Sequence, residues 1–290
     1  MAIQTATTGN LASAQNIIVA ECRFTGEHND PCHNLVSSFT LGKGEKQITV
    51  PKVGQMTAEA LTDGTAITSA ADIGLTTVDL TCSEVGVRVV LTDKLTRQFN
   101  ENIFRILGRQ TGDAISRYVD KAIIALFPAL NGGAVLGADG SSCGLQQVSG
   151  CVAWMMSAKA PRPYFFVHHP NAIANLCMNA AGVGTSYYAG IQSGFPEEKL
   201  RDFWKIQVSG VNCYQDGNID KISTFDSGYG VVASREAMCY IESLAPTVER
   251  QRQAALRAWE IIHVTDYGVF ELDDSYGAPA QYEIGTLLTA

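Results

Sequence analysis

The segment from position 54 to position 81 places the strongest limit on how this chain can fold. It reads GQMTAEALTDGTAITSAADIGLTTVDLT and contains no lysine or arginine and few large apolar side chains. Such a segment has little to bury, whereas ordering its backbone costs about 1–2 kcal/mol per residue. Folded back on itself, it would give two limbs that each reach roughly 45 Å. We therefore predict a β-hairpin that projects from the body and lies on a neighbouring subunit; the alternative is an unstructured surface loop.

The residues that follow predict one long strand and then a very long helix. Apolar residues alternate in even register up to Cys82 and in odd register from Val85 to Leu91, so the register slips by one residue. Such a slip indicates a β-bulge or a bend within the strand. Over residues 93–127 apolar residues recur at helical spacing, and Thr92 can cap the N-terminal end. An unbroken helix of this length would extend about 50 Å.

The remaining sequence predicts a mixture of helices and strands around a weakly patterned start. We expect helices over 145–158, from Pro170 onward and over 235–243, and strands over 164–168, 205–215 and 229–234. The stretch 247–272 is ambiguous by periodicity, and its second half favours a long strand because it is rich in β-branched and aromatic residues. Positions 1–45 have weak periodicity, so we expect an extended arm there instead of a core element.

Charge, hydropathy and cysteine content exclude several classes of protein. The chain has 290 residues, a net charge of −8 and 17% charged residues, which argues against a nucleic-acid binder and indicates much surface in contact with something other than water. The N-terminus lacks the basic start and apolar run of a secretory signal, and no run of about 18 apolar residues predicts a membrane span. The eight cysteines form no CxxC pair, so we interpret them as reduced thiols, which implies that the protein is synthesised in a cytoplasm.

Candidate catalytic and metal-binding residues are few. The best metal-binding candidates are Cys22, His28, Cys32 and His33. Their spacing, C-x5-H-x3-C-H, fits no standard zinc pattern, and whether they bind a metal stays open. His168 and His169 are adjacent in an expected strand, so their side chains point to opposite faces and we interpret them as a strand end. No cysteine lies in a recognisable nucleophile turn and no phosphate-binding loop is present, so we expect no catalytic residues and no cofactor, and we assign no metal ligands.

In their order along the chain, the elements from about Gly54 to Leu287 resemble those of the major capsid proteins of tailed bacteriophages, which have the Hong Kong 97-like fold. The stretches that carry the resemblance are TTVDLTCSEVGVRVVLTDKLTRQFNENIF at 76–104 with its V-x-LTD junction at 89–93, GRQTGDAISRYVDKAIIALF at 108–127, PYFFVHHPNAIANL at 163–176, VSGVNCY at 208–214, GYGVVASREAMCY at 228–240 and RAWEIIHVTDYGVFELDDSYGAPA at 257–280. The resemblance implies an α+β fold with an N-terminal arm, an extended β-hairpin loop, a long spine helix, a peripheral domain and an axial domain.

The resemblance also implies domain boundaries and a subunit interface. The expected divisions are an N-terminal arm over 1–45, the extended loop over 46–84, a peripheral domain with the spine helix over 85–130, an axial domain over 131–246 and returning peripheral-domain strands over 247–290. The expected interface on the extended loop and spine helix consists of Met56, Glu59, Leu61, Asp63, Ile67, Asp72, Ile73, Arg88, Arg97 and Arg105.

A member of this family would be a structural protein and not an enzyme. It would self-assemble as hexamers and pentamers into an icosahedral shell that encloses double-stranded DNA without sequence-specific binding and without a membrane. It would be made and assembled in the host bacterial cytoplasm and end in the virion. No lysine lies between Lys52 and Lys94, so a covalent cross-link from the loop is not expected. The lead-in is short, which implies a separate scaffolding protein, with a portal and a decoration protein as further candidate partners.

Two other functions remain open. An encapsulin-type compartment shell shares the fold, but it would need an amphipathic N-terminal helix for cargo, and residues 1–20 show no strong apolar stripe. A cysteine- or metal-dependent hydrolase would need a deep pocket that brings His168 or His28 close to a thiol. We favour the phage shell over the compartment, and both over the hydrolase.

Overall fold

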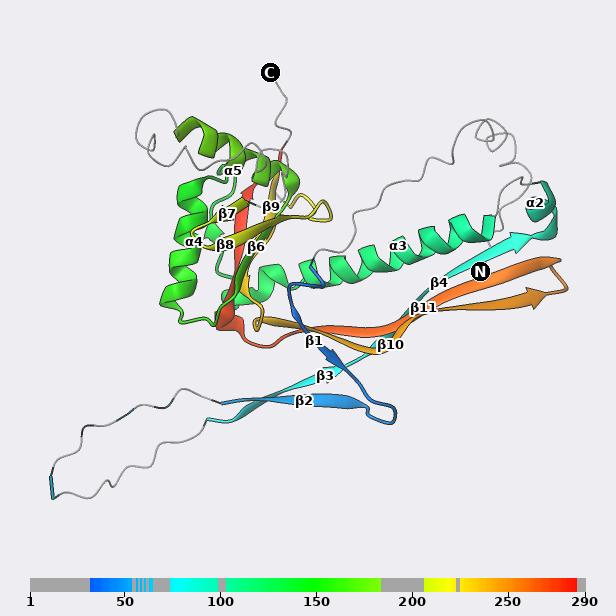
Figure 1. The fold of residues 1–290 in the computed structure, drawn as a ribbon, viewed down its shortest axis with the longest axis horizontal. Helices are drawn as coiled ribbons and strands as arrows, with labels where there is room; N and C mark the ends of the chain where they lie inside the picture. The colour runs from blue at the N-terminus through cyan, green and yellow to red at the C-terminus, as the bar shows by residue number, and fades with distance from the viewer. Residues whose placement is uncertain are drawn as a thin grey trace.

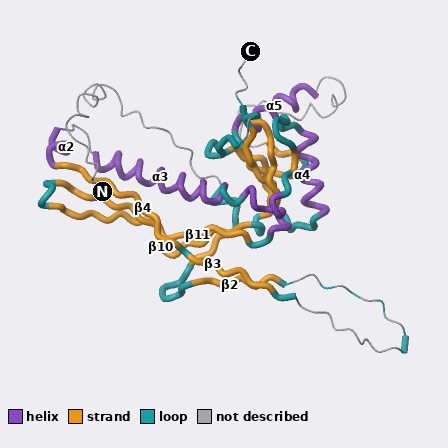
Figure 2. The backbone as a smooth tube through the Cα atoms, turned by 180° about the vertical axis from the view of Figure 1, so that it is seen from behind, coloured by secondary structure: helices purple, strands orange, loops and turns teal. Residues whose placement is uncertain are grey.

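A computed structural model describes residues 32–53, 74–98, 103–183, 206–222 and 225–285, together with positions 56, 58, 60, 63 and 64. These residues form a six-stranded sheet, a four-stranded sheet and a separate two-stranded hairpin, with helices packed on the two larger sheets (Figure 1). The combination of helices and sheets confirms the predicted α+β class. The six-stranded sheet lies at one end of a long ribbon that is built from the four-stranded sheet (Figure 2).

The six-stranded sheet is buried on both faces. Its strands, in spatial order, are β5 (Leu136–Gly137), β12 (Gly277–Glu283), β9 (Ser227–Ser234), β6 (Tyr164–His168), β8 (Val211–Gln215) and β7 (Ile206–Val208). Phe166 and Val232 face α4 (Leu145–Ser157) and α5 (Pro170–Val183), whereas Phe165 and Val231 belong to a second core on the opposite face. Burial on both faces explains why β6 is apolar at successive positions instead of alternating.

The four-stranded sheet forms the long ribbon. Its strands, in spatial order, are β1 (Ser37–Thr40), β10 (Met238–Gln253), β11 (Ala258–Glu271) and β4 (Ser83–Thr92). The short helix α2 (Asp93–Gln98) follows β4, and α3 (Ile103–Ile124) runs back along the sheet (Figure 1). Thr111, Ile115, Val119 and Ile123 are buried at a spacing of four residues and form the stripe of α3 that faces the core.

The hairpin of β2 (Gln47–Lys52) and β3 (Thr76–Thr81) projects from the side of the ribbon (Figures 1 and 2). The two strands are antiparallel, with Gln47 opposite Thr81 and Lys52 opposite Thr76. The base of this hairpin agrees with the predicted β-hairpin that projects from the body. Most of the tip, including the stretch 65–73, lies outside the described residues.

The predicted helix over 235–243 is wrong. Residues 235–237 form a turn, and β10 begins at Met238. Residues Cys239–Ile241 pair with β1 on one side and with β11 on the other, and their side chains are buried. A central position between two strands overrides local helical propensity, because every backbone polar group there finds a partner in the sheet. β10 then continues to Gln253, so the first half of 247–272 is also mostly strand.

The bulge or bend predicted in one long strand near residues 83–86 is instead a change of sheet just before it. β3 pairs with β2 up to Thr81, and β4 pairs with β11 from Ser83 onward. Cys82 is the single residue between the two strands. The slip in alternation therefore marks the point at which the chain leaves the hairpin and enters the ribbon, which a periodicity pattern cannot distinguish from a bulge.

Two further expectations differ from the structure at the chain ends of the described part. Cys32, Val36 and Leu41 are buried in the core, so residues 32–41 are not a peripheral arm; positions 1–31 lie outside the described residues. β12 joins the six-stranded sheet next to β9, so the last part of 247–290 does not return to the ribbon. Both segments are short and weakly patterned, and only long-range pairing places them.

Most of the predicted helices and strands of the central region are confirmed, because α4, α5, β6 and β9 occupy the segments where the sequence predicts them. The strand predicted over 205–215 is instead two antiparallel strands, β7 and β8, joined by a turn at Ser209 and Gly210. The long helix is described as α2 and α3, and residues 99–102 between them lie outside the described residues. α3 ends at Ile124, before the 3-10 helix η2 (Phe127–Gly133), which contains Pro128.

Candidate assembly surface

The base of the hairpin is fixed to the body by a small buried core. Leu80 on β3 is fully buried, and it belongs to a cluster with Leu41, Cys239 and Ile241. A side chain at Gly268 on β11 would lie 2.2 Å from the carbonyl oxygen of Thr81, so glycine is required where the ribbon passes β3. The hairpin therefore leaves the body at a crossing that packing determines.

One ion pair ties the outer end of β2 to the body. Lys52 Nζ lies 2.7 Å from Asp273 Oδ2, next to the 3-10 helix η4 (Asp274–Tyr276). Burial opposes ionisation of Asp273, but the hydrogen bonds from Lys52 and Ser275 outweigh it and hold the pKa of this carboxyl below its usual value. On the hairpin itself, the hydroxyl of Thr49 donates to Asp79 Oδ1 at 2.6 Å. These contacts set the direction in which the hairpin projects.

Beyond this base, the hairpin carries exposed apolar side chains. Val53, Met56 and Leu75 are 57%, 56% and 61% exposed, and we call them the hairpin patch. Exposed apolar residues that gather on one projecting element indicate a surface that another protein covers. Met56 is one of the residues that the sequence predicts at the interface, whereas Val53 and Leu75 were not predicted.

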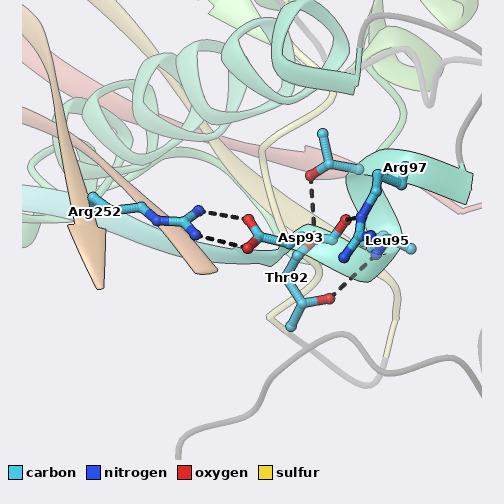
Figure 3. A network of polar contacts seen from close by, with 6 residues as sticks. Thr92, Asp93, Leu95, Arg97 and Arg252 are labelled. Atoms are coloured by element: carbon cyan, nitrogen blue, oxygen red, sulfur yellow. Dashed lines mark hydrogen bonds and ion pairs between the residues drawn. The ribbon is translucent and has the colours of Figure 1, made fainter. Parts of the chain in front are cut away.

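The far end of the ribbon carries a network that joins three elements (Figure 3). Arg252 on β10 donates to both carboxylate oxygens of Asp93, at 2.5 Å and 2.7 Å, and its guanidinium lies 5.3 Å from the ring centroid of Trp259 on β11. The hydrogen bonds from Arg252 lower the pKa of Asp93. Thr92 accepts the N–H of Leu95 at 3.4 Å, which caps α2 as predicted.

Arg252 is exposed and Asp93 is half-buried, and exposed apolar side chains lie along the same ribbon. Leu244, Val248, Leu256 and Trp259 lie on the ribbon with exposed fractions from 38% to 48%, and we call them the ribbon patch. Arg252 and Trp259 were not predicted from the sequence. Arg252 and Asp93 are far apart in the sequence and carry no local motif, so no pattern could have paired them.

The predicted interface residues are only partly brought together. Arg88 on β4 forms an ion pair with buried Glu260, to which Gln253 also donates a hydrogen bond, so Arg88 serves this chain's own ribbon. Arg97 is exposed on α2 and its Nε donates to the carbonyl oxygen of Asp93 at 3.3 Å. Asp63 is exposed near the hairpin tip.

The remaining predicted interface residues cannot be placed by their side chains. Arg105 belongs to the first turn of α3, but its side chain lies outside the described part. The predicted residues that lie outside the described residues altogether are Glu59, Leu61, Ile67, Asp72 and Ile73.

The candidate metal-binding residues do not gather as a set. Cys22 and His28 lie outside the described residues, and the His33 ring packs edge-on against Tyr240 with 4.4 Å between centroids. Cys32 instead approaches Asp120 and Asp216, and one ligand atom of each lies within 4.8 Å of the others. Burial, followed by the charges of both carboxyls, raises the pKa of the Cys32 thiol well above its ordinary value, which disfavours the thiolate that a metal would need.

The histidine and thiol environments do not match those of a hydrolase. His168 is fully buried against Phe166 and Tyr282, and burial lowers its pKa to about 3. Burial also raises the pKa of Cys213 and of Cys239 to about 12, so both thiols stay protonated at neutral pH. His169 accepts the N–H of Asn171 at the start of α5. The interpretation of the two histidines as a strand end is confirmed.

Comparisons of the sequence with protein-family models and with curated proteins found no match. In the part of the chain that the structure describes, no helix combines the length and the apolar character that crossing a membrane requires.

Comparison with solved structures shows the fold. A structure of Mycobacterium phage Che8 matches with a TM-score of 0.64 at 15% identity, over 81% of this chain and 84% of that chain. The capsid of a native GTA particle matches with a TM-score of 0.67 at 13% identity, over 96% of this chain and 100% of that chain. The SrpI encapsulin of Synechococcus elongatus matches with a TM-score of 0.65 at 11% identity, over 100% and 99%. This chain therefore has the Hong Kong 97-like fold of capsid shells.

Proposed function

We propose that this chain is the major capsid protein of a tailed bacteriophage and assembles as hexamers and pentamers into an icosahedral shell. The observation that carries the proposal is the hairpin, which projects from the body with an exposed apolar patch, on a fold that solved capsid structures share. A two-stranded β-hairpin is only marginally stable on its own. It becomes stable when a neighbouring copy covers it.

The ribbon patch supplies a second surface for the same purpose. Its exposed leucine, valine and tryptophan side chains lie on β10, on β11 and in the turn between them, and the hairpin patch lies on a separate projection of the molecule (Figure 1). Two different apolar surfaces on one molecule allow copies to assemble head to tail, which gives a closed ring when the rotation from one copy to the next closes. We infer that the hairpin of one copy lies across the ribbon of the next.

The charge of the chain suits a shell around DNA. A net charge of −8 gives no general attraction to the phosphate backbone, so the shell would enclose double-stranded DNA without binding a particular sequence. We assign the hairpin to the extended loop, α3 and the ribbon to the peripheral domain, and the six-stranded sheet to the axial domain. The expected partners are further copies of the chain, a separate scaffolding protein, a portal and a decoration protein, with assembly in the host bacterial cytoplasm.

Electron microscopy of the purified chain, alone and co-expressed with neighbouring phage genes, tests the proposal. We expect closed icosahedral particles of uniform size. Leu75→Asp places a charge in the hairpin patch and should abolish particles while leaving the circular dichroism spectrum unchanged. Leu75→Met keeps the apolar contact and serves as the matched control. A monodisperse monomer under every condition, or normal particles from Leu75→Asp, would contradict the assignment.

An encapsulin-type compartment is the second candidate. It rests on the match to the SrpI encapsulin, which covers nearly the full length of both chains. The contents of particles purified from the native source distinguish the two functions: packaged double-stranded DNA supports the phage shell, whereas a packaged enzyme supports the compartment. The hydrolase has the least support, because the described histidines and thiols lack the required pairing.

A further inference from the structure

A buried cluster joins three distant parts of the chain at the junction of the two large sheets. Cys32 precedes β1, Asp120 lies on α3, and Asp216 follows β8; their exposed fractions are 2%, 0% and 0%. The Cys32 thiol donates to Asp216 Oδ2 at 3.4 Å, and the Cys32 N–H donates to Asp120 Oδ1 at 3.4 Å. The two carboxyls together hold the first described residue of the chain against the core.

A single residue, Asn218, orients both carboxyls. Its backbone N–H donates to Asp216 Oδ1 and its side-chain amide donates to Asp120 Oδ2, each at 2.8 Å. One carboxyl oxygen of Asp120 and one of Asp216 lie within 4.8 Å of each other. Ionising both would place two like charges side by side in a buried site.

The charged groups around the cluster are engaged elsewhere. On α3, Lys121 pairs with Asp220 at 3.0 Å, and in the β8–β9 loop Lys221 pairs with Asp226 at 2.9 Å. His33, beside Cys32, packs on Tyr240 of β10, whose ring stacks on Tyr267 of β11. None of these contacts involves Asp120 or Asp216.

We propose that Asp120 and Asp216 share one proton and act as a latch that holds residues 32–36 against α3 and the six-stranded sheet while the proton is bound. Loss of the proton leaves two carboxylates facing each other and weakens their hold on Cys32. Because β1 follows directly and pairs with β10, release also loosens the edge of the ribbon. The latch belongs to a single chain and does not depend on the proposed function.

The direction of the pH effect follows from the burial of the cluster. Burial, reinforced by the neighbouring Asp120 carboxyl, raises the pKa of Asp216 to about 7. The latched state thus binds a proton that the released state, with an ordinary carboxyl pKa, gives up at lower pH. The stabilisation is complete below the ordinary carboxyl pKa and is lost as the pH rises through about 7.

Hydrogen exchange of the full chain between pH 5 and pH 8, measured by mass spectrometry in the presence of EDTA, tests the latch. After correction for intrinsic rates, the amides of residues 33–41 should exchange at least about tenfold faster at the upper end of this range. Amides of β6, which lies in the core of the six-stranded sheet, report whether the whole protein opens. Equal protection at both pH values in the wild-type chain would overturn the proposal, as would loss of protection at pH 5 in EDTA, which would indicate a bound cation.

Variants separate the shared proton from a merely structural role. Asp216→Asn can still accept the N–H of Asn218 and can donate to Asp120, so its 33–41 segment should stay protected at every pH. Asp120→Asn removes the same repulsion from the other side and should behave alike if Asp216→Asn does not fold. Asp220→Asn, an exposed carboxyl of the same loop, is the matched control and should follow the wild-type chain. A pH response in either cluster variant equal to that of the wild-type chain would refute the shared proton.

Discussion

At the scale of single residues, Leu80 decides whether the hairpin is held by the body. It is fully buried in the cluster at the hairpin base, although it belongs to a segment that is otherwise poor in large apolar side chains. We predict that Leu80→Ala lowers the free energy of unfolding by about 2–5 kcal/mol, since it removes buried methyl groups and leaves a cavity. Urea denaturation of the unassembled subunit measures the change.

The matched control for this substitution is Leu75→Ala, because Leu75 is 61% exposed on the same hairpin. An exposed leucine away from any cap or core should change the free energy of unfolding by less than about 0.5 kcal/mol. Equal losses for the two variants would mean that Leu80 is not the anchor that its burial indicates.

At the scale of elements, the ion pair between Lys52 and Asp273 couples the hairpin to the turn that precedes β12. The lowered pKa of Asp273 means that this tie is present above the ordinary carboxyl pKa and is lost as the pH falls through the folded-state value. We predict that Lys52→Gln speeds hydrogen exchange of β2 and β3 at neutral pH, and that acidification removes the difference from the wild-type chain.

Lys46→Gln is the control for this prediction, since Lys46 is exposed just before β2 and carries the same charge. It should leave exchange of the hairpin strands unchanged. If Lys46→Gln and Lys52→Gln accelerate exchange equally, overall charge and not the specific pair governs the hairpin. Low pH weakens the ion pair of Asp273, whereas high pH weakens the contact at Asp216. The hairpin should therefore loosen at low pH and residues 33–41 at high pH.

At the scale of the whole molecule, the two apolar patches predict that assembly covers surface that the single chain leaves exposed. Trp259 in the ribbon patch is 38% exposed. If a neighbouring hairpin covers it, its fluorescence emission should shift to shorter wavelength on assembly, and the assembled chain should unfold at higher temperature than the free subunit. The Trp259→Phe variant identifies the signal, because the shift should disappear in particles of this variant. Particles with an unshifted spectrum would place the contact elsewhere.

Two replacements of residues 54–73 distinguish the role of the side chains of the hairpin tip from the role of its length. Joining β2 to β3 by a short Asn-Gly turn should leave the body folded, because the base contacts at Leu80 and Lys52 remain. It should nevertheless abolish closed particles. Replacement by a glycine–serine linker of equal length removes the side chains alone. Normal particles from both replacements, seen by electron microscopy, would mean that the hairpin does not join subunits.

The sequence by itself determined the local elements and the projecting hairpin. The helices over 145–158 and from Pro170 and the strand over 164–168 follow from periodicity and capping, which act over a few residues. The scarcity of large apolar side chains over 54–81 required a segment without a core of its own. The order of these elements was also sufficient to predict the capsid fold that the solved structures share.

Only the tertiary structure decided the features that depend on residues far apart in the sequence. The strand at Met238 replaces a predicted helix because β1 and β11 enclose it, and Cys82 marks a change of sheet that looks like a bulge in one dimension. The Arg252–Asp93 pair and the Asp120–Asp216 cluster likewise join distant positions. Local sequence carries the period of an element, whereas the partner of a strand or of a buried charge depends on where the rest of the chain lies.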